Sequence, residues 1–170
     1  MEDSLKQISA FFPVPEYIGG QLKLIDSMQL PLTFTTTMNK VATSRMASPE
    51  ELVAYAKSFQ QPDISDRDLK RYYTETSIAD QASPSVTLIY AATRPDLKVQ
   101  KINVFVKPDP VENDKVTGIY IEKIFKLKDT LFNQQLYWKS GRNLQINTEK
   151  KIKGITLPVE QVKISWDGSD

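Results

Sequence analysis

The chain has 170 residues, 40% of them hydrophobic and 25% charged, and it contains no histidine and no cysteine. A chain of this length and composition can bury a core without a metal or a disulfide bond. The two missing residue types exclude thiol nucleophiles, disulfides and the usual zinc and haem ligands. With 22 basic and 21 acidic side chains, the chain carries no overall charge that would attract nucleic acid. We therefore expect no cofactor, no metal and no nucleic-acid partner.

The sequence has no apolar run that approaches the roughly 18 residues of a membrane-spanning helix, so we expect no transmembrane segment. Residues 1–12 also lack the basic start and the continuous apolar core of a signal peptide. We therefore expect either a cytoplasmic protein or one whose targeting segment precedes residue 1.

The first half of the chain, residues 1–83, is predicted to be mainly helical with one strand. Apolar residues at helical spacing predict a short helix over residues 3–12 and a second helix over residues 17–25. Leucine and phenylalanine alternate with threonines over residues 30–38, which predicts a strand. Residues 74–84 are rich in small and polar side chains, and we interpret them as a connector.

The strongest helix signal is the segment Ser48-Pro49-Glu50-Glu51. Ser48 can cap the helix, Pro49 suits its first position, and Glu51 lies where a capping box requires it. This helix is predicted to continue to about residue 60. A shorter helix is predicted to begin at Ser65.

The second half of the chain, residues 84–166, predicts six short antiparallel strands in succession. Each strand alternates apolar and polar residues, and compact turns such as Ser140-Gly141 separate them. A sheet with one apolar face needs a cover, which the amphipathic helices upstream can provide. The residues predicted to face this cover are Ile102, Val104, Ile119, Ile121, Phe132, Leu136, Leu144, Ile146, Val162 and Ile164.

The predicted fold is therefore α+β: a curved six-stranded antiparallel meander packed on the N-terminal helices. We interpret residues 1–170 as a single domain. In outline, such a sheet is close to cystatin-like folds or to the half-barrels of lipoprotein carriers. Any pocket is expected between the concave face of the sheet and the helices.

Few residues stand out as candidates for a site. Asp63, Asp66 and Asp68 lack the spacing of a calcium loop, and we interpret them as helix-capping residues. Tyr73 lies beside basic residues, and Tyr137 precedes the inward-facing Trp138 and so points outward. We select Tyr73 and Tyr137 as candidate contacts for a ligand or a partner.

A basic cluster, Lys150, Lys151 and Lys153, has no interleaved aromatic residues. We interpret it as the soluble end of a strand rather than as a nucleic-acid contact. The sequence contains no glycine-rich phosphate loop and no serine nucleophile motif.

Several short segments together carry a likeness to a known family. They are Phe11-Phe12-Pro13, Tyr17–Ile25, Asp63–Asp66, Tyr72-Tyr73, Pro95–Val99, Leu136–Gly141 and Leu144–Ile146. In this succession the chain resembles uncharacterised small envelope lipoproteins of Bacteroidetes. The likeness covers most of the chain loosely and implies that a signal peptide with a lipidated cysteine precedes residue 1. It also implies a periplasmic protein or one that is anchored to a membrane by lipid, with cytoplasmic location as the alternative.

Two functions follow as expectations. The first is a non-enzymatic binding or interaction domain of the cell envelope, whose partner is a protein or an apolar small ligand. The second is a small-molecule-binding enzyme of cystatin-like architecture that uses Asp, Glu and Tyr chemistry. The second requires ionisable groups that meet inside one pocket, whereas the first requires an apolar surface or cavity without them. We favour the first, because no predicted strand places an acidic residue on its apolar face.

Overall fold

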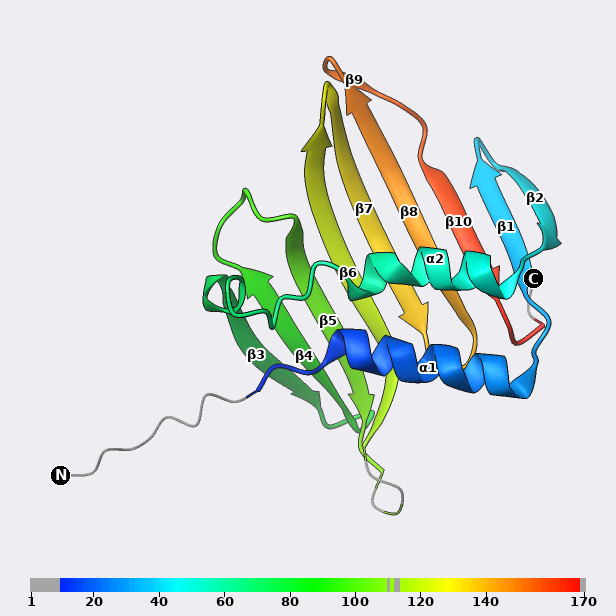
Figure 1. Ribbon diagram of the computed structural model, residues 1–170. Helices are drawn as coiled ribbons and strands as arrows, with labels where there is room; N and C mark the ends of the chain where they lie inside the picture. Colours follow the sequence, from blue (N-terminus) through cyan, green and yellow to red (C-terminus); the bar gives the residue numbers. More distant parts are fainter. Residues whose placement is uncertain (1–9, 110, 112–113, 169–170) are drawn as a thin grey trace.

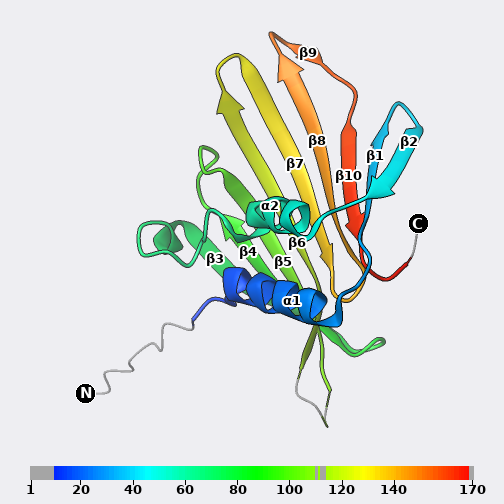
Figure 2. The same ribbon diagram turned by 45° about the vertical axis from the view of Figure 1, so that its right-hand side comes forward.

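The computed structural model describes residues 10–109, 111 and 114–168. These residues form an α+β fold in which two α-helices cross one face of a curved, ten-stranded antiparallel sheet (Figures 1 and 2). The sheet is open and does not close into a barrel. The helices are α1 (Val14–Met28) and α2 (Pro49–Gln60). The strands are β1 (Thr33–Met38), β2 (Val41–Met46), β3 (Tyr73–Asp80), β4 (Ser85–Ala92), β5 (Val99–Lys107), β6 (Lys115–Leu127), β7 (Thr130–Lys139), β8 (Asn143–Ile152), β9 (Ile155–Thr156) and β10 (Glu160–Ser165).

The strands run in the order β2-β1-β10-β8-β7-β6-β5-β4-β3, and the short β9 pairs with β8. Strands β3 to β8 form a continuous meander. The N-terminal hairpin β1–β2 extends the sheet by pairing β1 with the last strand, β10. This long-range pairing joins the two ends of the chain in one sheet.

The predicted meander of the second half is confirmed in number and register, with β9 as an addition. Of the ten side chains predicted to face inward, nine are buried and only Phe132 is half-buried. Since a slip of one residue would reverse the faces of a strand, this agreement fixes the register. The helix signal at Ser48 is also confirmed. The Ser48 hydroxyl accepts from the Glu51 amide and the Glu51 carboxylate accepts from the Ser48 amide, both at 3.2 Å.

The prediction of one strand in residues 1–83 is wrong, because β1, β2 and β3 all lie there. The connector predicted over residues 74–84 is mostly strand β3. Strands β2 and β3 are the two edges of the sheet and are almost wholly exposed, so they lack the apolar alternation that predicts a strand. The helix predicted from Ser65 is only a 3-10 turn at Lys70–Tyr72. The helix predicted over residues 3–12 lies mainly outside the described residues.

A layer of large side chains fills the space between the helices and the sheet. The Trp138 ring of β7 is 1% exposed and lies 5.4 Å from the Phe59 ring of α2 and 5.2 Å from the Trp166 ring. Helix α1 is fixed by hydrogen bonds as well. The Tyr17 hydroxyl lies 2.5 Å from that of Ser140, and the Phe12 amide donates to the Tyr90 hydroxyl over 2.9 Å. These contacts attach the start of α1 and the end of α2 to the sheet.

Candidate functional site

An apolar hollow among the described residues lies between the two helices, and we call it the interhelical groove. Its walls are the C-terminal half of α1, the loop that leads to β1, and the start of α2. Its volume is about 430 Å³, which lies within the range of roughly 300–1,000 Å³ typical of small-molecule sites. It is lined by Leu22, Lys23, Ile25, Asp26, Gln29, Leu30, Leu32, Pro49, Leu52 and Val53.

The groove has an apolar floor and a partly polar rim. Ile25, Leu32 and Leu52 are buried side chains of the core, and they form the floor. Lys23 and Asp26 are exposed residues of α1, and they are the ionisable groups of the lining. A floor of this kind favours the apolar part of a ligand, because binding removes that part from water. The rim remains accessible to a polar group of the same ligand.

The expectation of a pocket between the sheet and the helices is wrong. Among the described residues, the space found there is a hollow of about 10 Å³ beneath the end of α2. This is too small for a ligand, because the aromatic residues Phe59, Trp138 and Trp166 already fill the concave face. The groove forms instead where the two antiparallel helices leave space between them.

A buried lysine borders this small hollow. Lys123 lies on the inward face of β6 and is only 3% exposed. Its ammonium donates to the Ser58 carbonyl and, over 2.7 Å, to the Gln61 carbonyl, so it caps the C-terminal end of α2. Burial, together with the nearby charge of Lys98, lowers the pKa of Lys123 to about 8. Because both acceptors are backbone carbonyls and the hollow that Lys123 lines holds only about 10 Å³, we interpret Lys123 as structural.

Tyr73 does not belong to an exposed contact surface, contrary to the expectation from the sequence. Its side chain is buried at the start of β3, and its hydroxyl donates to the Val99 carbonyl over 2.7 Å. Burial raises the pKa of Tyr73 to about 12. The residue therefore joins β3 to β5 within the core.

Tyr137 lies on the convex face of the sheet, which no helix among the described residues covers (Figure 2). Its ring is half-buried, 4.9 Å from the Tyr120 ring. The Tyr120 hydroxyl donates to the Glu122 carboxylate over 2.7 Å, and burial is the main cause that raises the pKa of Tyr120. These ionisable groups meet on an open face and not inside a pocket. A role of Tyr137 as a contact residue stays a prediction.

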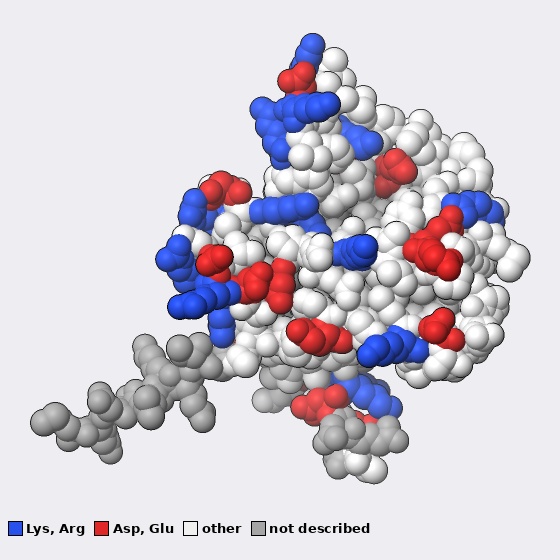
Figure 3. Space-filling model, viewed as in Figure 1, with Lys and Arg blue, Asp and Glu red and all other residues white. Residues whose placement is uncertain are grey.

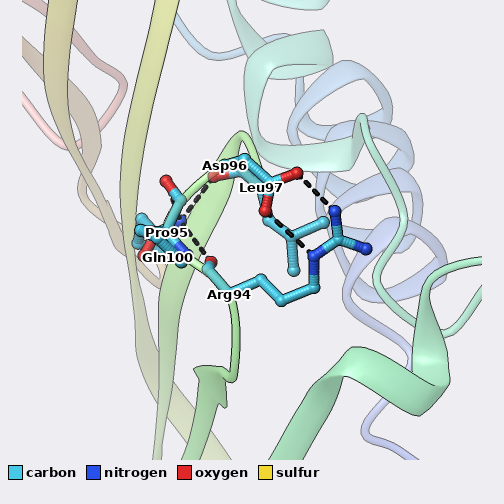
Figure 4. Close-up of polar contacts among 5 residues, drawn as sticks. All are labelled: Arg94, Pro95, Asp96, Leu97 and Gln100. Atoms are coloured by element: carbon cyan, nitrogen blue, oxygen red, sulfur yellow. Dashed lines mark hydrogen bonds and ion pairs between the residues drawn. The ribbon is translucent and has the colours of Figure 1, made fainter.

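The loop between β4 and β5 contains a dense set of polar contacts (Figure 4). The Arg94 guanidinium donates to both carboxylate oxygens of Asp96, at 3.0 and 2.5 Å. The Gln100 amide donates to the carbonyls of Arg94, Pro95 and Leu97. The charges of Arg94 and Asp96 are paired with each other, and the side-chain amide of Gln100 bonds to the backbone of the loop. We therefore interpret these contacts as stabilising the turn and not as a ligand site.

The interpretation of the acidic residues after α2 as helix caps is wrong, because only the 3-10 turn at Lys70–Tyr72 follows them and no side chain among the described residues caps it. The Asp63 carboxylate accepts from the amide and the hydroxyl of Ser65, at 2.9 and 2.7 Å. Among the described residues, no group of three or more acidic side chains is arranged to hold a metal ion.

Reasoning from the sequence missed the groove. Leu22, Ile25 and Leu52 lie on the apolar helix faces that were expected to pack on the sheet. They also form part of the lining of the groove. The available signal was the apolar residues outside those faces, Leu30 and Val53, of which Val53 is 45% exposed. Whether such residues line a groove depends on the distance between two helices, which the sequence does not state.

Comparison with known proteins gives no relative from which a function could be transferred: no family model, no curated protein and no solved structure matches this chain. In the part of the chain that is described, neither helix has the length and apolarity needed to span a membrane.

Proposed function

We propose that this chain is a non-enzymatic binding domain of the cell envelope, and that its ligand inserts an apolar chain into the interhelical groove. The observation that carries the proposal is the groove itself, with an apolar floor of Ile25, Leu32 and Leu52 and a volume suited to a small ligand. The ionisable groups of the rim, Lys23 and Asp26, are suited to orient a polar head at the entrance.

The absence of catalytic groups from the groove supports binding rather than catalysis. An enzyme of the alternative class needs two or more ionisable groups that converge on one substrate and have perturbed ionisation. The described cluster with these properties, Tyr120 with Glu122, lies on the open convex face and outside the interhelical groove. We therefore keep the enzyme as the less favoured function.

The envelope location and a lipid anchor belong to the proposal through the likeness to Bacteroidetes lipoproteins. Of the two outlines considered, we propose the half-barrel of lipoprotein carriers. This choice is supported by an open, strongly curved sheet with both helices on its concave face (Figure 2).

Filling the groove should abolish binding. We expect the Val53→Trp variant to bind the neutral apolar probe N-phenyl-1-naphthylamine at least about tenfold more weakly than the natural chain, a difference of roughly 1.4 kcal/mol. Val53 lines the groove and is 45% exposed, so a larger side chain can occupy the groove without entering the core. Fluorescence titration of the probe measures the effect.

The matched control is Ala54→Trp, which adds the same indole to the next residue of α2, an exposed position outside the lining. This variant should bind the probe as the natural chain does. Equal affinity of both variants, or no saturable binding by the natural chain, would contradict the proposal.

A further inference from the structure

Three hairpin turns point to the same end of the sheet, the upper end in Figure 1, where the β1–β2 turn lies apart from the other two. They join β1 to β2, β6 to β7 and β8 to β9, and each has only two residues between the paired strands. A lysine occupies each turn: Lys40, Lys128 and Lys153. The chain thus places three ammonium groups at the same edge of the molecule.

The register of the strands shows how apolar and basic residues alternate near two of these turns. The last row before the turns holds Leu127, Thr130, Ile152 and Ile155 side by side. The next row holds Lys126, Leu131, Lys151 and Thr156, on the opposite face of the sheet. Basic side chains therefore flank an apolar row on both sides. We call Lys126, Leu127, Lys128, Lys151, Lys153 and Ile155 the tip surface.

The apolar members of the tip surface are strongly exposed, since Leu127 is 59% and Ile155 is 66% accessible to solvent. Among the described residues, none of its lysines forms an ion pair. Two acidic residues, Asp129 and Glu149, lie close to it in the sequence. Figure 3 shows basic side chains gathered at this end of the molecule with little acidic surface among them.

The backbone at these turns is unfavourable for lysine. Lys40, Lys128 and Lys153 have φ angles of 64°, 54° and 49°, in the left-handed region that favours glycine and asparagine. A lysine in this conformation costs energy that a glycine would not. Lysine nevertheless occupies three turns at this end of the sheet. We infer that its charge serves an interaction with a partner and not the stability of the fold.

We propose that the tip surface docks onto the anionic surface of a phospholipid membrane. The lysines attract the negative headgroups, and Leu127 and Ile155 enter the boundary between headgroups and acyl chains. This inference does not rest on the interhelical groove, which lies between the helices and away from the turns.

The exposed aliphatic side chains favour a membrane over nucleic acid. Leu127 and Ile155 gain nothing from a phosphate backbone, whereas they gain free energy on entering an apolar phase. The tip surface also has neither arginine nor an exposed aromatic ring, which nucleic-acid surfaces use for base contacts.

Vesicle flotation tests the proposal on the full chain. The natural chain should bind vesicles of phosphatidylcholine mixed with phosphatidylglycerol, should not bind phosphatidylcholine alone, and should be released by high salt. Both the double variant Lys128→Glu with Lys153→Glu and the double variant Leu127→Ser with Ile155→Ser should weaken binding to the mixed vesicles by about tenfold or more.

The control is Lys107→Glu with Lys139→Glu, which makes the same charge change at the opposite end of β5 and β7 and should leave vesicle binding intact. Equal binding to both vesicle types would overturn the proposal, as would no binding to either; this comparison needs no variant. Binding to duplex DNA at least as tight as to mixed vesicles, with no effect of the serine variants, would assign the surface to a soluble polyanion instead.

Discussion

Replacing Trp138 by alanine should lower the free energy of unfolding by about 3–5 kcal/mol, the usual cost of deleting a large core aromatic. Trp138 is 1% exposed and contacts rings from both α2 and the C-terminal segment, Phe59 and Trp166. The substitution therefore removes the side chain that joins the helix layer to the sheet. Its indole N–H has no hydrogen-bond partner among the residues that the structure describes, so the loss is one of packing.

Urea unfolding measures this effect, and Tyr137→Ala is its matched control. Tyr137 is the neighbouring aromatic residue on the same strand, but its half-buried ring contacts Tyr120 on the convex face. We expect a loss of about 1 kcal/mol there, since only part of the ring is removed from water. A larger loss for Tyr137→Ala than for Trp138→Ala would mean that the concave face is not the core.

Lys123 should contribute a rise of about 2 kcal/mol to the free energy of unfolding between pH 8 and pH 10. Its pKa is about 8 in the folded protein and close to 10.5 in the unfolded chain. Between these values the unfolded chain binds the additional proton, so removing protons from solution favours the folded state. Above pH 10 the trend should reverse, because Tyr73 and Tyr90 have their pKa raised to about 12 and resist ionisation in the folded protein.

Unfolding in urea at a series of pH values measures this dependence. The Lys123→Met variant should lose the rise between pH 8 and pH 10, whereas Lys163→Met, at a half-buried lysine of β10, should retain it. If the stability of the natural chain changed with pH over this interval just as that of the Lys123→Met variant does, Lys123 would not be buried as described.

The meander could be predicted because its strands have one buried and one solvent-facing side. Ile119 and Ile121 of β6 alternate with polar residues, and the same pattern recurs in the neighbouring strands. The cap of α2 could be predicted because Ser48 and Glu51 act through local hydrogen bonds. In both cases the information lies within a few residues of the chain.

The edge strands could not be predicted in this way. Strand β2 is exposed at every position, and β3 buries only Tyr73, so neither shows a hydrophobic period. They become strands because β1 and β4 offer unpaired backbone groups beside them. Tyr73 was misjudged for the same reason: its burial depends on β5, whose Val99 carbonyl accepts from its hydroxyl.

The candidate site depends on tertiary distances that no local pattern contains. The interhelical groove exists because α1 and α2 leave space beside Leu30 and Val53, which the sequence presents only as apolar residues outside the main helix faces. Lys123 did leave a signal, as a lysine on the inward face of β6 between Ile121 and Phe125. A lysine in such a position is either a functional amine or a buried group that caps a helix end. The hydrogen bonds to two backbone carbonyls at the end of α2 favour the second interpretation.

The central claim is that an apolar ligand occupies the interhelical groove, and methyl NMR tests it most directly. N-phenyl-1-naphthylamine should shift the methyl signals of Leu22, Leu52 and Val53 through its ring currents, in a saturable manner. The methyl signals of Leu127 and Ile155, at the far turns, should stay unchanged. Unchanged groove methyls, or shifts confined to residues beside Tyr137 or to the tip surface, would contradict the claim.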